Sequence, residues 1–465
     1  MMDVHDGSKV IHFVGLGGIG VSGLAEILHS IGYSVQGSDI RQSRNIERLK
    51  RLGIPAFVGH NGLYVNNASI VVYSSAIKRD NPELLRAREL RIPCLTRAEM
   101  LSQIVRLKKS VVIAGSHGKT TVTSICAAML EVASMSPTVI NGGVINSYQT
   151  NAKLGSGNWA VVESDESDGS FVTLFPTIGI VTNIDREHIN HYGSFENLKL
   201  AFKSFLNNLP FYGAGIVCLD DTNVEEVIGD ITDRNIITYS IAKDSMVRAV
   251  NIKKTAIGST FDVKIRDEIL EGVSIPLLGE HNILNTLAAI AMATELKIDS
   301  DIIKTTLASF SGVSRRFTVL GDIRGISFID DYAHHPTEIR TLIESAKQKT
   351  SGRIVIICQP HRFTRLNLLF SEFCECFYGA DTIVITSVYR GDDTETSDIS
   401  SRNLYDSLHK AGKNVIFAAD EAAVATIVKD LIDNNILDNG DVILFAGAGS
   451  ISKWAHGIYG ELLER

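Results

Sequence analysis

Short runs of apolar residues recur along the chain, and most of them end at a turn rich in glycine or in polar residues. Runs with such boundaries predict buried strands. Apolar residues at helical spacing follow several of these runs, and strands that alternate with helices predict an α/β fold with mostly parallel sheets. The expected helices are 21–31, 119–133 and 283–296, and the expected strands are 10–14, one ending at 37–39, 70–73, 111–114, 159–163, 177–182, 326–329, 354–358 and 442–445.

One strand–helix pair encloses a loop typical of phosphate binding. The stretch from Ser110 to Thr121 reads SVVIAGSHGKTT: a buried strand, a glycine-rich turn and the start of a helix. Glycine lets backbone N–H groups close on phosphate oxygens, while the helix N-terminus and a lysine add positive charge. The hydroxyl of Thr120 is the expected Mg²⁺ ligand. The predicted ATP-binding residues are Gly115, Ser116, His117, Gly118, Lys119, Thr120 and Thr121.

This loop is a short form of the pattern. Position 113 is Ile113, where the longer G-x-x-x-x-G-K-[ST] pattern has a glycine. The alternative is a plain glycine-rich turn with one lysine. A solvent-facing turn needs no G-K-T-T after a buried strand, so we favour the ATP loop.

A second glycine pattern, G-x-G-x-x-G, lies near the start of the chain. Gly15, Gly17, Gly18 and Gly20 follow the first predicted strand, and Asp39 ends the second. This arrangement is typical of a dinucleotide fold in which the acid binds a ribose hydroxyl, and taken alone it predicts an NAD-dependent oxidoreductase. The pattern by itself is a weak signal, and a turn used only for packing is a further alternative.

The segment around this pattern is too short for two mononucleotide halves, because the ATP loop begins by residue 115. The strand at 70–73 ends in Ser74 and Ser75. The carboxyl ends of neighbouring parallel strands form one ligand crevice. The glycine loop can therefore hold the pyrophosphate of a nucleotide-linked substrate, with Ser75 beside it.

Acidic segments follow two predicted strands of the central segment. One strand ends at Glu163 in the sequence ESDESD, and the next is followed by NIDREH with His188 at its end. Both loops should face the crevice that holds the ATP loop. Mg²⁺ prefers oxygen ligands and tolerates imidazole, so Glu163 and His188 are the predicted ligands. At least two of Asp165, Glu166 and Asp168 are expected to form a solvated turn.

Two asparagines and two arginines follow in the same segment. Asn282 and Asn285 lie three residues apart on one face of a predicted helix, where their amides can read a base edge. Helix capping by Asn282 is the alternative. The stretch SGVSRRF is a predicted linker, and its arginines, Arg315 and Arg316, are either solvated or reach phosphates.

Three loops of the last segment follow predicted strands. They read DDYAHHP after 326–329, QPHRFTR after 354–358 and AGAGS after 442–445. A parallel sheet places all three loops at one edge. Histidine, arginine and tyrosine side chains there are costly to bury unless they meet polar or anionic ligands. Arg362 and Arg365 suit a carboxylate, which a guanidinium binds bidentately.

Composition and charge narrow the class of protein. The 465 residues suggest about two to four domains, and 45% hydrophobic with 21% charged residues is ordinary for a globular protein. A net charge of −8 disfavours nonspecific nucleic-acid binding. The start, MMDVHDGSKV, lacks the apolar region of a secretory signal, and no apolar run reaches the roughly 18 residues of a membrane span. The six scattered cysteines indicate reduced thiols, so we expect a cytoplasmic enzyme without membrane insertion.

The motifs occur together in an order that resembles the Mur ligase family. AGSHGKTT, ESDESD, TNIDREH, GEHNILN, RRF, DDYAHHPTE and QPHRFTR extend over nearly the whole chain, and HFVGLGGIGVSGLAEIL with DDYAHHPTE resembles the alanine-adding branch. The resemblance implies three α/β domains: a Rossmann-like UDP-binding domain at 1–108, a central P-loop ATPase domain at 109–313, and a Rossmann-like domain at 314–465 that closes on ATP and the amino acid. It also implies that the first glycine loop binds UDP pyrophosphate rather than NAD.

The reaction implied by the resemblance is an ATP-dependent amide ligation. It joins L-alanine to the lactyl carboxylate of UDP-N-acetylmuramate through an acyl phosphate, giving ADP and phosphate in peptidoglycan precursor synthesis. Two Mg²⁺ ions, domain closure and a monomer or weak dimer are expected. The nearest alternative is a recycling ligase that adds a preformed peptide. A folate-type ligase, an NAD-dependent oxidoreductase and a noncatalytic nucleotide-binding regulator are the others.

Residue roles carry over by position. The resemblance implies catalytic roles for Lys119, Glu163, His188, Arg362 and Arg365, and metal ligation by Thr120, Glu163 and His188. It places Asn282, Asn285, Arg316 and Asp331 around ATP, and Gly15, Gly17, Gly18, Gly20, Asp39 and Ser75 around the UDP part. It places Tyr332, His334, His361, Arg362 and Arg365 at the amino-acid site.

Three positions depart from the family pattern or lack a role. Ser116 stands where threonine is frequent, which keeps the hydroxyl. Ser450 stands where an acid is usual, so we assign it no role. Lys203 lies near the place of a modified lysine in sister ligases, but we interpret it as a surface helix lysine.

Overall fold

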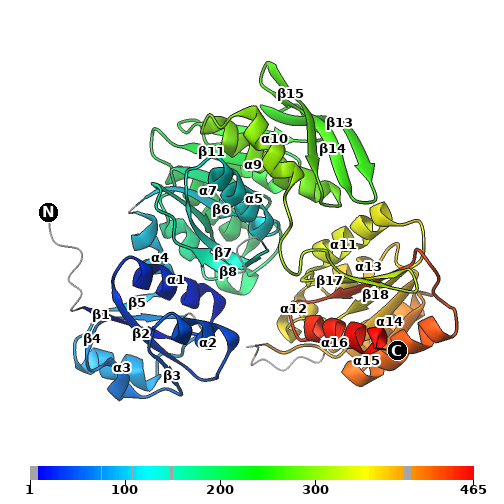
Figure 1. Cartoon of the computed structure of the whole chain (residues 1–465), viewed down its shortest axis with the longest axis horizontal. Coiled ribbons are helices and arrows are strands. Elements are labelled where there is room, and N and C mark those ends of the chain that lie inside the picture. The colour runs from blue at the N-terminus through cyan, green and yellow to red at the C-terminus, as the bar shows by residue number, and fades with distance from the viewer. Residues whose placement is uncertain are drawn as a thin grey trace. The chain divides into compact units, whose positions relative to one another are not determined.

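The computed structural model describes residues 9–464 except 75, 107, 147–149, 392 and 394–398. The chain divides into two compact units (Figure 1). Unit 1 comprises Met1–Asn251, Phe261–Val273 and Leu284–Ser311, and unit 2 comprises Ile252–Thr260, Ser274–Ile283 and Gly312–Arg465.

The N-terminal part of unit 1 is a parallel sheet in the order β3-β2-β1-β4-β5. The strand order reverses at β1, so the loops that leave β1 and β4 diverge and open a crevice at their carboxyl ends. The strands are β1 (Val10–Val14), β2 (Ser34–Asp39), β3 (Ala56–Val58), β4 (Ala68–Tyr73) and β5 (Cys94–Thr96). The helices are α1 (Ile19–Ser30), α2 (Arg44–Arg51), η1 (Gly62–Val65), α3 (Pro82–Glu89) and α4 (Arg97–Val105).

A buried polar network lies inside this first sheet. The carboxylate of Glu83 is paired with Nε2 of His12 at 2.9 Å and accepts a hydrogen bond from Oγ of Ser38 at 2.7 Å. It also accepts one from the backbone N–H of Asn61 at 3.0 Å. Burial opposes the charge, but the bonds to His12 and Ser38 prevail and hold the pKa of Glu83 below its usual range.

The central sheet of unit 1 is mixed, and its order is β15-β14-β13-β12-β11-β10-β6-β9-β7-β8. Its strands are β6 (Lys109–Ala114), β7 (Thr138–Ile145), β8 (Thr150–Lys153), β9 (Trp159–Glu163), β10 (Ile178–Val181), β11 (Ala214–Cys218), β12 (Ile236–Ser240), β13 (Val247–Thr255), β14 (Gly258–Ile265) and β15 (Glu268–Ile275). Its helices are α5 (Lys119–Val132), η2 (Ser170–Thr173), α6 (Ile189–Tyr192), α7 (Phe195–Asn207), α8 (Thr222–Ile228), α9 (Glu280–Glu295) and α10 (Ser300–Ala308).

Strand β6 lies between β10 and β9 and is parallel to both. Ala114 pairs with Val181, and Ile113 pairs with Glu163, so the three strands end at nearly the same level. The ATP loop therefore leaves the sheet between the two acidic loops. This confirms the expectation that both acidic loops face the ATP loop.

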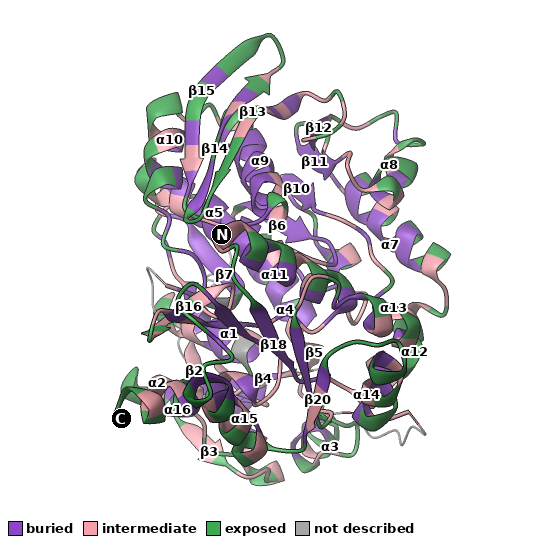
Figure 2. Cartoon of the chain, turned by 90° about the vertical axis from the view of Figure 1, so that its right-hand side faces the viewer, coloured by how far each residue is buried: buried purple, intermediate pink, exposed green. Residues whose placement is uncertain are grey.

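The sheet of unit 2 has the order β16-β17-β21-β18-β19-β20, with β16 antiparallel to the rest. Its inner strands are buried between helices, whose outer faces are exposed (Figure 2). The strands are β16 (Thr318–Ile323), β17 (Ile326–Asp331), β18 (Ile354–Cys358), β19 (Thr382–Thr386), β20 (Val415–Ala418) and β21 (Val442–Ala446). The helices are α11 (Pro336–Lys349), α12 (Phe363–Leu368), α13 (Phe370–Glu375), α14 (Ser401–Lys410), α15 (Glu421–Asp433) and α16 (Ile451–Leu463).

The neighbouring parallel strands β17, β21 and β18 confirm that the three polar loops of this segment leave one edge. Several predicted boundaries were wrong, and two of them bear on the site: those of β17 and α9. Strand β17 continues through Asp330 and Asp331, which pair in register with Phe445 and Ala446. Helix α9 begins at Glu280 rather than at 283, so Asn282 lies inside its first turn and does not cap it.

Candidate functional site

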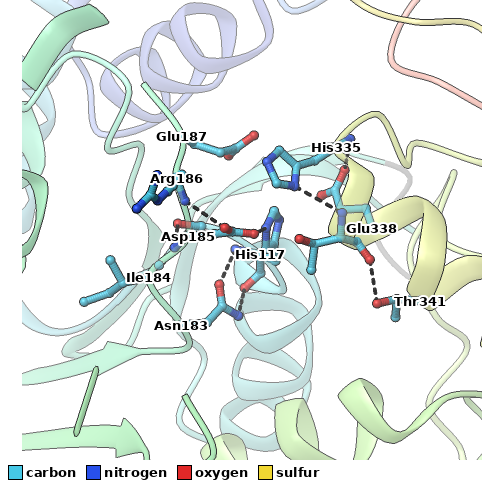
Figure 3. A network of polar contacts seen from close by, with 12 residues as sticks. His117, Asn183, Ile184, Asp185, Arg186, Glu187, His335, Glu338 and Thr341 are labelled. Atoms are coloured by element: carbon cyan, nitrogen blue, oxygen red, sulfur yellow. Dashed lines mark hydrogen bonds and ion pairs between the residues drawn. The ribbon is translucent and has the colours of Figure 1, made fainter. Parts of the chain in front are cut away.

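The ATP loop is fixed to the loop that follows β10. The backbone N–H of Ser116 donates to the carbonyl of Asn183 at 3.0 Å, and that of His117 donates to Oδ1 of Asn183 at 2.8 Å. The hydroxyl of Thr182 donates to the carbonyl of His117 at 2.6 Å, and Nε2 of His117 lies 2.9 Å from Oδ2 of Asp185. Figure 3 shows His117, Asn183 and Asp185 joined in this way. The loop conformation is therefore set before any phosphate arrives.

Two glycines of the loop admit no side chain. Gly115 has φ +133°, and a Cβ there would lie 2.1 Å from Oγ1 of Thr182. Gly118 has φ +82°, and a Cβ there would lie 2.5 Å from Oδ1 of Asn285. Asn285 on α9 therefore lies against the ATP loop. Asn282 is also buried, and its amide donates to the carbonyl of Leu278 at 2.7 Å.

Lys119 lies across its own loop and pairs with Glu166. Its ammonium donates to the carbonyls of Gly115 at 2.5 Å and Ser116 at 3.0 Å, and lies 2.8 Å from Oε2 of Glu166. Burial works to lower the pKa of Lys119, but the Glu166 carboxylate outweighs burial and raises it above the usual range. Burial raises the pKa of Glu166 to about 7 against the opposing charge of Lys119. Lys119 therefore stays charged across the neutral range.

Glu166 was missed as a site residue in the sequence. Its side chain is 2% exposed, whereas Asp165 in the same segment is exposed, as expected for the solvated turn. The hydroxyl of Tyr192 donates to the carbonyl of Glu166 at 2.5 Å and fixes its backbone. A buried acid among four in ESDESD has no local signal, because its partners come from α5 and α6.

The side chains of Glu166, Glu187 and His188 lie close enough together to hold a Mg²⁺ ion. Thr120 follows Lys119 on α5, and Oε2 of Glu163 accepts a hydrogen bond from the backbone of Gly142 at 2.8 Å. Ligand atoms of Glu166, Glu187 and His188 all lie within 4.8 Å of one another. Nε2 of His188 is 3.8 Å from Oε1 of Glu166 and 3.8 Å from Oε2 of Glu187. These oxygen and imidazole donors fit a divalent cation.

The first glycine loop is closed by Asp39. The backbone N–H of Gly17 donates to Oδ2 of Asp39 at 2.8 Å, and the backbone N–H of Gly15 donates to the carbonyl of Ser38 at 2.9 Å. Asp39 therefore fixes the loop at the carboxyl end of β2. Gly18 is the N-cap of α1 and Gly20 lies in its first turn, so both face the crevice end of the helix. Ser75 lies outside the described residues.

Arg97 at the start of α4 is a second residue that the sequence did not reveal. A Cβ on Gly20 would lie 3.2 Å from Cδ of Arg97, so the arginine side chain covers the start of α1. Partial burial works to raise the pKa of Asp165, but the charge of Lys119, the hydrogen bonds from Ser167 and the charge of Arg97 together lower it. Arg97 thus lies at the first glycine loop and contributes positive charge near the ESDESD segment.

In unit 2, two backbone N–H groups hold the buried side chain of Asp331. Its carboxylate accepts hydrogen bonds from the backbone N–H of Phe317 at 2.6 Å and of Ala333 at 2.7 Å. Burial raises the pKa of Asp331 to about 6, although Arg316 and these two donors oppose the shift. Asp331 therefore connects the RRF segment to the loop after β17.

Two arginines flank Tyr332 in this loop. The guanidinium of Arg315 lies 4.7 Å from the centre of the Tyr332 ring, and that of Arg316 lies 5.3 Å from it. Arg315 also donates to the carbonyl of Gly447 at 2.6 Å, so it links the loops after β17 and β21. The RRF arginines are therefore held at the polar edge of the sheet.

The predicted amino-acid residues gather at that same edge. The rings of Tyr332 and His334 are 5.1 Å apart and those of His334 and His361 are 5.8 Å apart. Nη1 of Arg365 lies 3.4 Å from Nδ1 of His361. Arg362 has φ +69°, and its Nε is buried without a hydrogen-bond partner among the described residues. Such a buried cationic donor suits an anionic ligand.

His361 is held in its neutral form. Burial lowers the pKa of His361 to about 3, and the nearby charges of His334, Arg365, Arg362 and Arg315 add to the effect. Tyr389 stacks on this ring at 5.6 Å, a contact that the sequence did not predict because Tyr389 follows a different strand.

Two further features concern membrane-spanning helices and the cysteines. Among the described residues we find no helix whose length and apolar character suit a membrane crossing. All six cysteines are free, and burial raises the pKa of the Cys358 thiol to about 12. Reduced thiols were expected from the sequence, and no cysteine is in a disulfide in the structure.

Comparison with known proteins extends the resemblance over the whole chain. Three family profiles match: "Mur ligase family, catalytic domain" at 10–109, "Mur ligase middle domain" at 113–293, and "Mur ligase, glutamate ligase domain" at 315–449. A protein from Rhodopseudomonas palustris (strain HaA2) is 48% identical over 460 residues, covering 97% of each chain. One from Paramagnetospirillum magneticum is 45% identical over 459 residues, covering 97% of this chain and 95% of that one. Both are named UDP-N-acetylmuramate–L-alanine ligase.

Solved structures agree with these matches. The crystal structure of UDP-N-acetylmuramate–alanine ligase from Thermotoga maritima superposes with a TM-score of 0.82 at 30% identity, covering 98% of this chain and 99% of that one. A murein peptide ligase from Psychrobacter arcticus gives a TM-score of 0.70 at 22% identity over 98% of both chains, a likeness of fold alone. This chain therefore belongs to the Mur ligase family.

Proposed function

We propose that this protein uses ATP to join L-alanine to the lactyl carboxylate of UDP-N-acetylmuramate in peptidoglycan precursor synthesis. The observation that carries the proposal is 45–48% identity, over about 97% of the chain, to proteins named for this reaction. The loop of Lys119, the acidic cluster beside it and the arginine-rich edge of unit 2 supply the groups that such a ligation requires.

The chemical difficulty is the leaving group. A carboxylate does not condense with an amine in water, because oxide is expelled too poorly. Transfer of the γ-phosphoryl group of ATP to the carboxylate gives an acyl phosphate, whose phosphate leaves readily. The carboxylate and the γ-phosphate are both anions, and two unit charges 4 Å apart repel by about 4 kcal/mol at an effective dielectric constant of about 20. Positive charge at the ATP loop must offset this repulsion.

Lys119 supplies the fixed positive charge. Its ammonium lies at the mouth of a loop whose backbone is already held by Asn183 and Thr182. Phosphate oxygens replace Glu166 as its partners, and the N-terminal N–H groups of α5 bind further oxygens. Asn285 borders the loop, and the family pattern assigns Asn282, Asn285 and Arg316 to the adenosine and phosphate groups of ATP.

The side chains at the ATP loop fit two Mg²⁺ ions. Thr120 and Glu163 would hold one ion, and His188 with Glu166 and Glu187 would hold the second. Bound Mg²⁺ supplies electrostatic stabilisation of the transferring phosphoryl group. The donor set, hard oxygen ligands with one imidazole, supports this assignment.

The other two substrates, UDP-N-acetylmuramate and L-alanine, bind to different parts of the chain. The first glycine loop, with Asp39 and Arg97, binds the UDP end of UDP-N-acetylmuramate. Arg362 and Arg365 bind the carboxylate of L-alanine, and Tyr332 forms part of the same pocket. The substrates and products belong to the cytoplasm, where we place the enzyme.

The recycling ligase that adds a preformed peptide is the weaker candidate. Its support is a likeness of fold at 22% identity, against 45–48% for the alanine-adding relatives. An NAD-dependent oxidoreductase is disfavoured, because all three segments of the chain match Mur ligase domains.

The test is an ADP-release assay with UDP-N-acetylmuramate, ATP and Mg²⁺. We expect ADP with L-alanine, and much less with glycine, L-serine, L-glutamate or a preformed L-alanyl peptide. Lys119→Ala should abolish ADP release while it still binds UDP-N-acetylmuramate, and Lys203→Ala on the surface of α7 should behave as wild type. Preference for the peptide would select the recycling ligase instead, and full activity of Lys119→Ala would refute the ATP-loop assignment.

A further inference from the structure

Three histidines at the edge of the unit 2 sheet are distinguished by their hydrogen bonds. Nδ1 of His334 lies 2.9 Å from the carbonyl oxygen of Tyr332. A carbonyl only accepts, so Nδ1 carries the proton and the lone pair of the neutral ring is on Nε2. His335, the next residue, has the opposite arrangement: its Nδ1 accepts from the backbone N–H of Thr337 at 3.3 Å and caps α11.

The third histidine, His361, is a poor proton acceptor. Guanidinium groups only donate, so Nη1 of Arg365 at 3.4 Å occupies the lone pair on Nδ1 of His361. Its depressed pKa of about 3 also opposes protonation at neutral pH. Of these three rings, His334 alone combines a donating Nδ1 with a basic nitrogen on its other side.

Glu338 is the carboxylate that faces His334. It stands one turn into α11, and its Oε2 lies 3.1 Å from Nδ1 of His334 (Figure 3 shows Glu338 on this turn). The same oxygen accepts hydrogen bonds from the backbone N–H groups of His334 at 3.0 Å and His335 at 3.2 Å. Both side chains are largely buried, with 16% and 14% exposed. Glu338 therefore fixes the ring of His334 and places negative charge beside its protonated nitrogen.

We propose that the His334–Glu338 pair accepts the proton of the alanine amine, with His334 as the catalytic base and Glu338 as its positioning residue. The inference rests on the proposed function. The amine nitrogen attacks the carbonyl carbon of the acyl phosphate, a C–N bond forms, and the C–O bond to phosphate breaks with its electron pair on the leaving oxygen. One N–H proton passes to Nε2 of His334 and then to water, so charge and atoms balance.

Glu338 lies among other charged and titratable groups of unit 2. Arg316, Asp331 and His281 lie near Glu338. Tyr332 and His361 lie beside His334, and Arg315, Arg362 and Arg365 act on His361. A carboxylate at 3.1 Å favours the imidazolium that forms when the amine loses its proton. Nη1 of Arg316 lies 3.8 Å from Oε1 of Glu338 and pairs with that carboxylate.

The rival account of Glu338 is purely structural, because it completes the capping box of α11. Glu338→Gln separates the two accounts. Glutamine accepts the same backbone hydrogen bonds, so the cap and the fold are kept while the charge is lost. Glu344→Gln, at an exposed position of the same helix, is the matched control.

Two measurements distinguish the formation of the acyl phosphate from the later attack by the amine. Without L-alanine, scrambling of ¹⁸O between the bridging and nonbridging positions of β,γ-labelled ATP, in the presence of UDP-N-acetylmuramate, reports acyl-phosphate formation alone. With L-alanine, steady-state turnover reports the whole reaction. We expect Glu338→Gln to scramble the label at the wild-type rate and to lose about tenfold or more in turnover, within the range of general-base catalysis.

The pH dependence gives a readout that a cap does not change. Loss of the carboxylate makes the imidazolium less stable, so the acidic limb of the turnover profile should move to lower pH in Glu338→Gln. An unmoved limb with wild-type turnover would overturn the proposal, and so would an equal fall of scrambling and turnover. If wild-type protein released no ADP with L-alanine, the proposed function itself would fail, which is a distinct result.

Discussion

The ammonium nitrogen of Lys119 lies 2.8 Å from a carboxylate oxygen of Glu166, and the two side chains are 14% and 2% exposed. The pair joins the first turn of α5 to the loop after β9. Its other bonds hold Lys119 to the carbonyls of Gly115 and Ser116. If phosphate binds at this loop as proposed, the lysine would exchange the Glu166 carboxylate for a phosphate oxygen, and Nε2 of His188, 3.8 Å from Oε1 of Glu166, would remain beside the released carboxylate.

Glu166→Gln should destabilise the nucleotide-free protein more than the nucleotide-bound protein. A buried lysine that loses its carboxylate partner costs on the order of 3 kcal/mol, and a bound phosphate supplies the missing negative charge. Thermal unfolding with and without saturating ADP measures the difference. Glu196→Gln, 70% exposed on α7, is the control. A deficit that ADP leaves unchanged would show that phosphate does not take the place of Glu166.

Gly118→Ala should abolish ATP binding, whereas Gly412→Ala should leave the affinity for ATP nearly unchanged. A Cβ at Gly118 lies 2.5 Å from Asn285, and the positive φ adds about 1 kcal/mol of strain. Gly412 has φ +74° with no atom within 4 Å of an added Cβ, so Gly412→Ala carries the strain without the clash. Calorimetric titration with ATP compares the two variants. Equal affinities in both would mean that contact between the loop and α9 is unimportant.

Arg365→Ala should raise the KM for L-alanine far more than the KM for ATP. A guanidinium–carboxylate pair in a partly buried site contributes about 2–3 kcal/mol, so the expected rise is on the order of 30- to 160-fold. Arg324→Ala, 63% exposed in the same unit, is the control. Steady-state kinetics with each substrate varied in turn gives the answer, and a rise confined to ATP would reassign Arg365.

Glu83→Gln should lower stability at pH 7 and matter less in acid. The folded pKa of Glu83 is lowered, so its contribution is present above the unfolded pKa, ordinarily about 4.5, and is lost as pH falls through the folded value. The expected cost at pH 7 is about 3 kcal/mol, because His12 keeps no carboxylate partner. Urea unfolding between pH 7 and pH 3.5 should show the two proteins converge. Glu89→Gln, 65% exposed on α3, is the control, and a pH-independent gap would exclude the charge as the cause.

Local patterns predicted the strands and their polar loops well. A buried run that ends in G-K-T-T specifies strand, turn and helix from neighbouring residues alone, and β6 with α5 follows that pattern. The edge at which loops meet was also predictable, since parallel neighbours end together. The helix boundary at α9 was wrong, because Glu280 and His281 enter the first turn although they do not belong to the apolar pattern.

Burial and proton placement were beyond the sequence. Glu166 and Asp165 are adjacent, yet only Glu166 meets Lys119 and Tyr192, which lie 47 and 26 positions away. Likewise, nothing in the sequence distinguishes the role of His334 from that of its neighbour His335. Their different roles come from the carbonyl of Tyr332 and the N–H of Thr337, whose directions depend on the turn into α11.

The continuous core of unit 1 has a consequence for how the protein unfolds. Leu28 on α1 and Leu101 on α4 belong to the same buried cluster as Ile140 on β7 and Phe171 in η2. Hydroxyl Oγ of Ser102 also donates to the carbonyl of Thr173 at 3.2 Å. A fragment that ends at residue 108 would expose to water the faces of α1 and α4 that pack against β7, β8 and η2. The first two sheets should therefore melt in one cooperative transition, and the N-terminal segment expressed alone should aggregate or stay unfolded.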